Sequence, residues 1–186
     1  MALITIPEVK TAFDITNISD NALITTLLAS ALSEAQKYCG RMFEQAQFTE
    51  YLQGDGGDTL IIKNTPISTA VSVSVYDDSD RAFGVDTLIA AADLDIWLDE
   101  GIIKYDGNVF AESKVRNVKV VYTGGYTAAT VPADLKQALI FLVGALYYEQ
   151  KGAILITSGE NVEDRPQRLR DQAHAMLDKY RSGSQL

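Results

Sequence analysis

Residues 117–150 read NVKVVYTGGYTAATVPADLKQALIFLVGALYYEQ, and the fold is built around this stretch. β-Branched and aromatic residues alternate along Val118–Thr123, which predicts a strand with one buried face. Gly124-Gly125 breaks the strand, and Pro132 suits the first turn of a helix. From Ala138 to Tyr148 every residue is apolar, aromatic or glycine, so this helix is expected to be buried on nearly all sides. The run is too short to cross a bilayer. Its covering must therefore be protein, either the rest of its domain or a neighbouring subunit.

The first forty residues predict a helical hairpin. Thr5 and Glu8 have the spacing of a capping box, which starts a short helix. A longer amphipathic helix begins at Ser19 or Asp20 and ends at Gly40, the expected C-cap.

The middle of the chain changes to the period of strands. Residues 48–53 and 59–62 flank a glycine-rich turn, which most simply predicts a β-hairpin. A third strand starts at Pro66, and residues 97–103 predict a further hairpin. The predicted fold class is therefore α+β. It has an N-terminal helical hairpin, central antiparallel β-strands with an acidic excursion, a long apolar helix and a charged C-terminal helix.

The acidic excursion covers residues 77–114. Between Asp77 and Asp106 its carboxylates are Asp77, Asp78, Asp80, Asp86, Asp93, Asp95, Asp99, Glu100 and Asp106, against Arg81 and Lys104. The spacing of a calcium loop fails, because Leu88 stands where the bidentate glutamate belongs when the loop starts at Asp77. The excursion is interpreted as a solvated, mobile segment. A metal-dependent hydrolase that uses residues 77–106 is the alternative from another functional class.

The net charge is −9, which argues against a protein that grips nucleic-acid phosphates. The charge is unevenly distributed. Residues 165–186 carry five Arg and Lys against two Asp, a net charge of +3, so the first 164 residues carry −12. An acidic body with a basic tail favours association with acidic protein surfaces, including those of its own copies.

The last helix, predicted over residues 165–181, has only a narrow apolar stripe on a highly charged rod. Such a helix has little to bury against its own body and is expected to dock on another protein or to pack loosely. The predicted contact residues are Arg165, Arg168, Leu169, Arg170, Met176, Leu177, Tyr180 and Arg181. The predicted division of the chain is a core domain over residues 1–151 and a loop with a docking helix over residues 152–186.

Catalytic chemistry is not predicted. His174 is the only histidine, and it lies on the charged last helix as a solvated residue. Cys39 is expected to be a small buried hydrophobe. The glycine clusters at 54–57 and 124–125 lack the features of phosphate-binding loops. We therefore expect no catalytic residue, no cofactor, no metal site and no membrane contact. No signal peptide is apparent, and a single cysteine suits a reducing cytoplasm.

Four stretches together resemble a known family. They are ALITIPEVK at 2–10, AQKYCGR at 35–41, VYTGGY at 121–126 and PADLKQA at 132–138. Their order and spacing are similar to those of the head-tail connector (adaptor, head-completion) proteins of tailed bacteriophages and prophages. The excursion over residues 77–114 is longer than in compact members of this family, and the basic last helix is not common to all of them.

The resemblance implies a structural protein of the virion neck, assembled in the host cytoplasm. Its members form a ring, usually of twelve copies, below the portal protein, where they extend the DNA channel and dock the next neck or tail protein. The passing DNA would not be bound in a sequence-specific way. A tail-side completion or terminator protein of the same particle is the alternative within this class.

Overall fold

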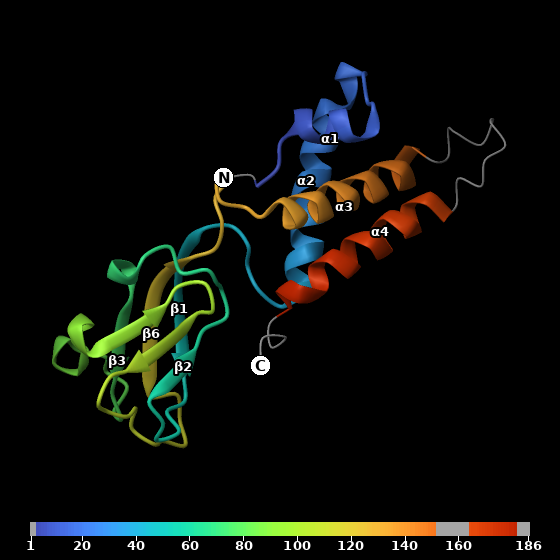
Figure 1. Ribbon diagram of the computed structural model, residues 1–186. Coiled ribbons are helices and arrows are strands. Elements are labelled where there is room, and N and C mark those ends of the chain that lie inside the picture. The colour runs from blue at the N-terminus through green and yellow to red at the C-terminus, as the bar shows by residue number, and fades with distance from the viewer. Residues whose placement is uncertain (1–2, 152–163, 182–186) are drawn as a thin grey trace. The chain divides into compact units, whose positions relative to one another are not determined.

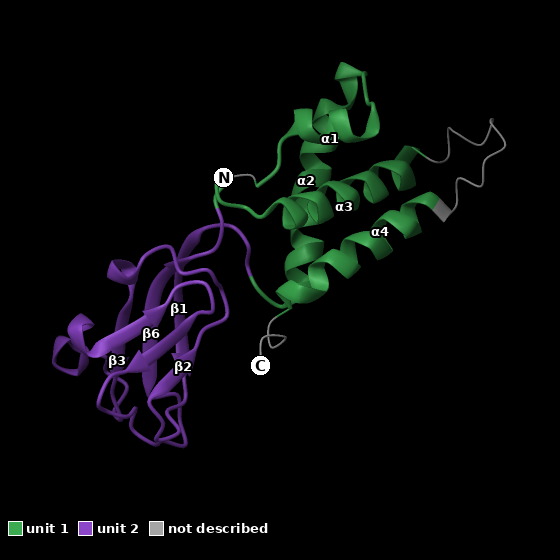
Figure 2. Ribbon diagram, viewed as in Figure 1, with its two compact units in different colours: residues 1–41, 127–186 green, residues 42–126 purple. Residues whose placement is uncertain are grey.

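The computed structural model describes residues 3–151 and 164–181 (Figure 1). The chain divides into two compact units (Figure 2). Residues 1–41 and 127–186 form one, here called the helical unit, and residues 42–126 form the other, the β unit. The β unit is thus an insertion between two halves of the helical unit. The predicted boundary after residue 151 stays a prediction, because residues 152–163, which adjoin it, lie outside the described residues.

Among its described residues, the helical unit contains four α-helices, α1 (Ile6–Phe13), α2 (Asn21–Cys39), α3 (Ala133–Lys151) and α4 (Asp164–Leu177). Each of the other helices contacts α3 (Figure 1). The predicted N-terminal hairpin is confirmed, and so is the capping box of Thr5 and Glu8. Gly40 ends α2 with φ = +68°, a left-handed conformation that glycine adopts without strain.

Helix α3 is buried in its middle but is not apolar along its length, which corrects the predicted long apolar helix. Asp134 and Lys136 lie in its first turns, and Glu149 and Lys151 lie in its last. Leu139, Leu142 and Val143 are almost completely buried, and the helices of the same unit cover them. This helix therefore gives no argument for a neighbouring subunit.

Gly144 is the point where α1 reaches α3. A Cβ atom at Gly144 would lie 2.1 Å from the ring of Phe13, so only glycine allows this approach. The Phe13 ring also meets Tyr148 edge-on, with 5.8 Å between ring centroids. The glycine within the apolar run thus serves the packing of α1.

Helix α4 packs against α3 and α2, so the expectation that it has little to bury against its own body is wrong. Pro166, Ala173, Leu177 and Tyr180 are buried. A narrow apolar stripe suffices because α4 inserts it between two helices and adds ion pairs along its sides.

The β unit consists of two three-stranded antiparallel sheets. One has the order β1-β6-β3, with β1 (Ala46–Leu52), β6 (Val118–Gly124) and β3 (Ser74–Asp77). The other has the order β2-β5-β4, with β2 (Thr59–Ile61), β5 (Ile102–Tyr105) and β4 (Leu94–Trp97). One cluster of buried side chains, including Val75, Val120 and Ile103, draws from both sheets.

Two strand predictions are confirmed, one is wrong, and the third strand, predicted from Pro66, begins only at Ser74 as β3. Residues 118–124 alternate between buried and half-buried positions, and β4 and β5 form the predicted hairpin. However, β1 pairs with β6 and β2 pairs with β5, so residues 48–62 are not a hairpin. The glycine-rich turn instead carries the chain from one sheet to the other.

The excursion at 77–114 is part of the core of the β unit, which corrects its interpretation as a mobile segment. Ile103 and Phe110 are completely buried. Asn117, also fully buried, accepts a hydrogen bond from the amide of Gly54 (2.9 Å) and donates to the Ala111 carbonyl (2.9 Å) and to Asp77 (2.9 Å). This network fixes both ends of the excursion to the sheet.

Among the described residues, no helix is long and apolar enough to cross a membrane.

Candidate protein-interaction surfaces

Arg170 joins three helices of the helical unit. From α4, its Nε donates to Glu34 of α2 (2.9 Å) and its Nη1 donates to Glu149 of α3 (2.7 Å). The hydrogen bond to Glu149 is the main cause that raises the pKa of Arg170. Its Nη2 also donates to Glu149 (3.3 Å), so the contact with Glu149 is bidentate and fixes geometry as well as charge. The guanidinium group of Arg170 is thus occupied by contacts within the helical unit.

The end of α4 is fixed by a second set of polar contacts. Tyr180 donates a hydrogen bond to Asp134 at the start of α3 (2.7 Å), and Lys179 forms an ion pair with the same carboxylate. Burial alone would raise the pKa of Asp134, but these two contacts outweigh it and the pKa lies below its usual value. Tyr38 of α2 donates to Asp178 (2.6 Å), which is the main cause that raises the pKa of Tyr38.

The predicted contact residues therefore fall into three groups. Leu177 and Tyr180 are buried within the helical unit. Leu169, Arg170 and Met176 are half-buried.

Three predicted contact residues are exposed, namely Arg165, Arg168 and Arg181. The guanidinium group of Arg165 lies 4.2 Å from the centroid of the Tyr148 ring, so its stem follows α3. A role in contacts with another protein stays a prediction for the whole set, and the exposed arginines are the members positioned for it.

The two side chains considered for chemistry have structural surroundings. Burial raises the pKa of the Cys39 thiol to about 11, so the thiolate is disfavoured. The ring of His174 stacks on Tyr38 with 4.2 Å between centroids, and its Nε2 lies 3.5 Å from Glu34. His174 is therefore part of the α2–α4 contact and not a fully solvated residue, as the sequence had suggested.

The carboxylates of residues 77–106 do not converge on a common point. Within the described parts of the chain, no group of three or more His, Cys, Asp or Glu side chains is placed to hold a metal ion. Several of these carboxylates have local roles instead. Asp78 accepts hydrogen bonds from the amides of Phe83 (2.7 Å) and Asp80 (2.9 Å). The amide of Phe83 is the main cause that lowers the pKa of Asp78.

The outward face of sheet β2-β5-β4 carries an apolar row. Ile61, Ile102 and Trp97 are directly paired across the three strands. Ile61 is 53% exposed and Trp97 is 48% exposed. Sequence reasoning missed this row because it paired β2 with β1. Only the correct strand pairing brings the three residues together.

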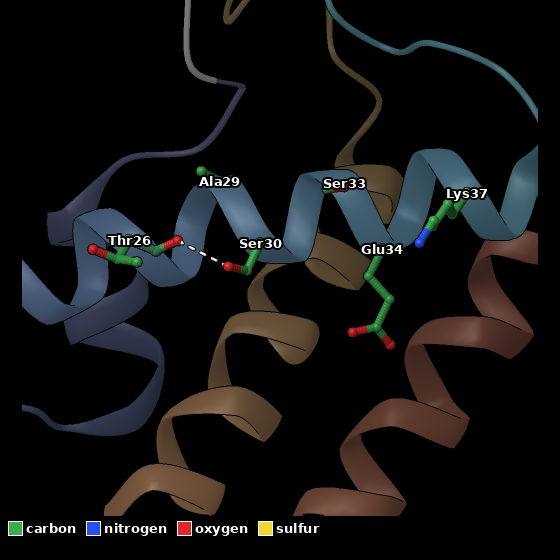
Figure 3. Close-up of a pocket in the computed structure, with 6 residues that line it drawn as sticks. All are labelled: Thr26, Ala29, Ser30, Ser33, Glu34 and Lys37. Atoms are coloured by element: carbon green, nitrogen blue, oxygen red, sulfur yellow. Dashed lines mark hydrogen bonds between the residues drawn. The ribbon is translucent and has the colours of Figure 1, made fainter.

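The exposed side of α2 has a shallow depression. Thr26, Ala29, Ser30, Ser33, Glu34 and Lys37, all of this one helix, line it, and its open volume is about 580 Å³; it is called the α2 hollow below. Figure 3 shows these side chains along the helix, with Thr26 and Lys37 at opposite ends. The hollow exists because four of its residues are small or short.

Comparison with known proteins identifies the family. The sequence profile described as head completion protein matches residues 2–182. The chain therefore belongs to the head completion protein family, whose members are structural proteins and not enzymes. The resemblance noted in the sequence is thus confirmed. No curated protein matches the sequence.

Solved structures share the fold. A chain in the neck of a native GTA particle computed with C12 symmetry aligns with a TM-score of 0.57 and 19% identity, over 89% of this chain and 85% of that chain. A chain in the neck of an empty GTA particle computed with C6 symmetry aligns with a TM-score of 0.56 and 21% identity, over 89% of this chain and 81% of that chain. A chain of the virion of a native gene transfer agent (GTA) particle aligns with a TM-score of 0.55 and 17% identity, over 92% of this chain and 85% of that chain.

Proposed function

We propose that this protein forms a ring in the neck of a tailed phage or phage-like particle, directly below the portal protein. The observation that carries this proposal is the family match, which runs over nearly the whole chain. The fold shared with neck chains of particles computed with C12 and C6 symmetry supports it. In this role the ring extends the DNA channel and offers its free side to the next neck or tail protein. Twelve copies would match a C12 neck.

The negative charge of the β unit suits a channel wall that DNA passes without adhering. The β unit contains fourteen Asp and Glu residues and six Lys and Arg residues, a net charge of −8. Surfaces of this sign repel the phosphate backbone, so DNA would slide past without adhering. The exposed residues Arg165, Arg168 and Arg181 of the helical unit are suited to contacts with acidic surfaces of the portal or of the next protein.

Reconstitution with the portal tests the proposal. Portal rings from the same particle are mixed with the full chain, and the products are imaged by negative-stain electron microscopy. We expect an added layer on one end of the portal ring. A chain that leaves portal rings unchanged at every concentration, and that does not associate with itself, would contradict the proposed function.

A charge reversal tests the part played by α4. Arg168→Glu should weaken docking to the portal, because Arg168 is exposed and its reversal repels an acidic partner. Arg116→Glu is the matched control, since Arg116 is also exposed but lies in the β unit. Equal docking of both variants and the wild type would remove α4 from the interface and leave the ring proposal standing.

A further inference from the structure

The apolar row on the outward face of sheet β2-β5-β4 is exposed and has no covering element within its own unit. Ile61, Ile102 and Trp97 form the row, and Leu98, 37% exposed, follows Trp97 in the chain. We call Ile61, Ile102 and Trp97 the outer sheet face. Exposed apolar side chains are ordinary when scattered, but a contiguous row across a short sheet marks a contact site.

Trp97 is held in place before any partner arrives. Its Nε1 donates a hydrogen bond to Asp95 Oδ2 at 3.0 Å, two residues earlier on the same strand face. The bond restricts the indole, so less rotamer freedom is lost when the ring is covered. Tryptophan is enriched among the residues that dominate interface energies. Trp97 is therefore a suitable central anchor.

Charge decides which surface can cover the outer sheet face. Asp95, Asp99 and Glu100 are exposed around it, and the whole β unit carries −8 whereas the helical unit carries −1. Two β units therefore repel each other. The helical unit of another copy is not repelled, and this favours contact between unlike surfaces of two copies.

The hollow on α2 has the complementary features. Ala29, Ser30 and Ser33 leave room for large side chains. Glu34 also lines the hollow but is bound to Arg170, whereas the exposed Lys37 stands at one end. Trp97, bordered by the acidic Asp99 and Glu100, thus has a counterpart in the α2 hollow, which has Lys37 at one end. Both halves are present on one chain, so each copy can give one and receive the other.

The geometry points to a head-to-tail contact in which the outer sheet face of one copy packs into the α2 hollow of a second copy. The inference rests on the proposed ring, since unlike surfaces joined head to tail close into a ring when the rotation fits. It goes further by naming the two surfaces. Trp97 enters the hollow, and Asp99 or Glu100 approaches Lys37.

The protein contains its own probe, because Trp97 is the single tryptophan. Its fluorescence emission is recorded over a wide range of protein concentration, with sedimentation velocity on the same samples. We expect the emission to shift to the blue as assemblies form, because the indole becomes buried. Assemblies that form while the emission stays constant would overturn this inference alone. A chain that stays monomeric and also fails to bind the portal would overturn the proposed function with it.

Two variants, each with a matched control, test the two surfaces. Ile61→Asp places a charge in the apolar row, and Val71→Asp makes the same change at a residue that is 93% exposed elsewhere in the β unit. Ser33→Tyr fills the hollow, and Thr25→Tyr adds the same side chain at an exposed position of α2 outside it. Ile61→Asp and Ser33→Tyr should each weaken self-association about tenfold or more, and the controls should associate as the wild type does.

Mixing the two variants gives the sharpest result. An Ile61→Asp copy keeps its hollow and a Ser33→Tyr copy keeps its sheet face, so together they can form one contact and no more. We expect pairs of one copy each in sedimentation, with neither variant pairing alone. A mixture that stays monomeric, or a Ser33→Tyr variant that assembles as the wild type does, would overturn the assignment of the α2 hollow.

Discussion

The helical unit contains ten Lys and Arg residues and eleven Asp and Glu residues, whereas the β unit contains six and fourteen. In the helical unit the opposite charges join helices. Lys136 binds Glu8, Lys151 binds Asp20, and Arg170 binds both Glu34 and Glu149.

In the β unit, Asp77 and Asp78 accept hydrogen bonds from backbone amides, while many of the remaining carboxylates face water. The difference teaches that charge has two uses in this molecule. One unit uses it to fix its helices, and the other displays a surplus that, in the proposed ring, would face DNA and neighbouring copies.

The largest expected effect separates the two units. Leu142→Ala in α3 and Ile103→Ala in β5 each remove a completely buried side chain and should each lower the free energy of unfolding by about 3 kcal/mol. Far-UV circular dichroism follows the helices, and Trp97 fluorescence follows the β unit. We expect Leu142→Ala to shift mainly the helical signal and Ile103→Ala mainly the tryptophan signal. Identical shifts of both probes in both variants would show that the units unfold as one.

A smaller effect concerns the ion pairs of the helical unit. Arg170→Ala leaves Glu34 and Glu149 without their shared guanidinium and should cost about 2 kcal/mol in chemical denaturation. Arg168→Ala, on the same helix but exposed, should change stability by less than about 0.5 kcal/mol. If the two variants are equally stable, the ion pairs of Arg170 with Glu34 and Glu149 do not stabilise the packing of these helices.

Acid should act on each unit through a different carboxylate. In the helical unit, Tyr147 donates to Asp20 (2.6 Å) and Lys151 donates to it as well (2.9 Å), and these bonds, in that order, lower the pKa of Asp20. A lowered pKa contributes stability above the unfolded value of about 3.9. That stability is lost as the pH falls through the lower folded pKa.

Asp20→Asn should therefore remove part of the acid sensitivity of the helical signal in thermal melts recorded between neutral and acidic pH. Asp78→Asn should do the same for the tryptophan signal of the β unit, because the pKa of Asp78 is also lowered. An Asp20→Asn variant whose helical signal keeps the full acid dependence would refute the first assignment.

Salt should produce the smallest effect, with opposite signs in the two units. Added salt screens repulsion among the surplus carboxylates of the β unit and should stabilise it by less than about 1 kcal/mol. The same salt weakens the partly exposed ion pairs of the helical unit and should destabilise it slightly. Melting curves followed by the two probes at low and high sodium chloride measure both effects. Shifts in the same direction would contradict the division of roles.

Local sequence signals predicted the elements whose partners are near in the chain. Thr5 and Glu8 gave the start of α1, Gly40 gave the end of α2, and the hairpin of β4 and β5 was recognised. The pairing of β1 with β6 could not be predicted, because these strands lie far apart in the sequence and a glycine-rich turn makes a local hairpin equally plausible. The covering of α3 was uncertain for the same reason, since α1 and α4, which pack against it, come from opposite ends of the chain.

The candidate surfaces were only partly visible in the sequence. The arginines of α4 could be named as contact residues, but composition does not show that Arg170 is bound to Glu34 and Glu149. The outer sheet face was not predictable either, because Ile61 and Trp97 meet only across β5. Both depend on tertiary contacts that no short window of sequence contains.

Cryo-electron microscopy of the intact particle tests the proposed place of this protein most directly. The account predicts a closed ring of density next to the portal, in which each copy fits one helical unit and one β unit and Trp97 is covered by the α2 helix of its neighbour. A reconstruction that has this chain elsewhere in the particle, or has no ring of it below the portal, would contradict the account.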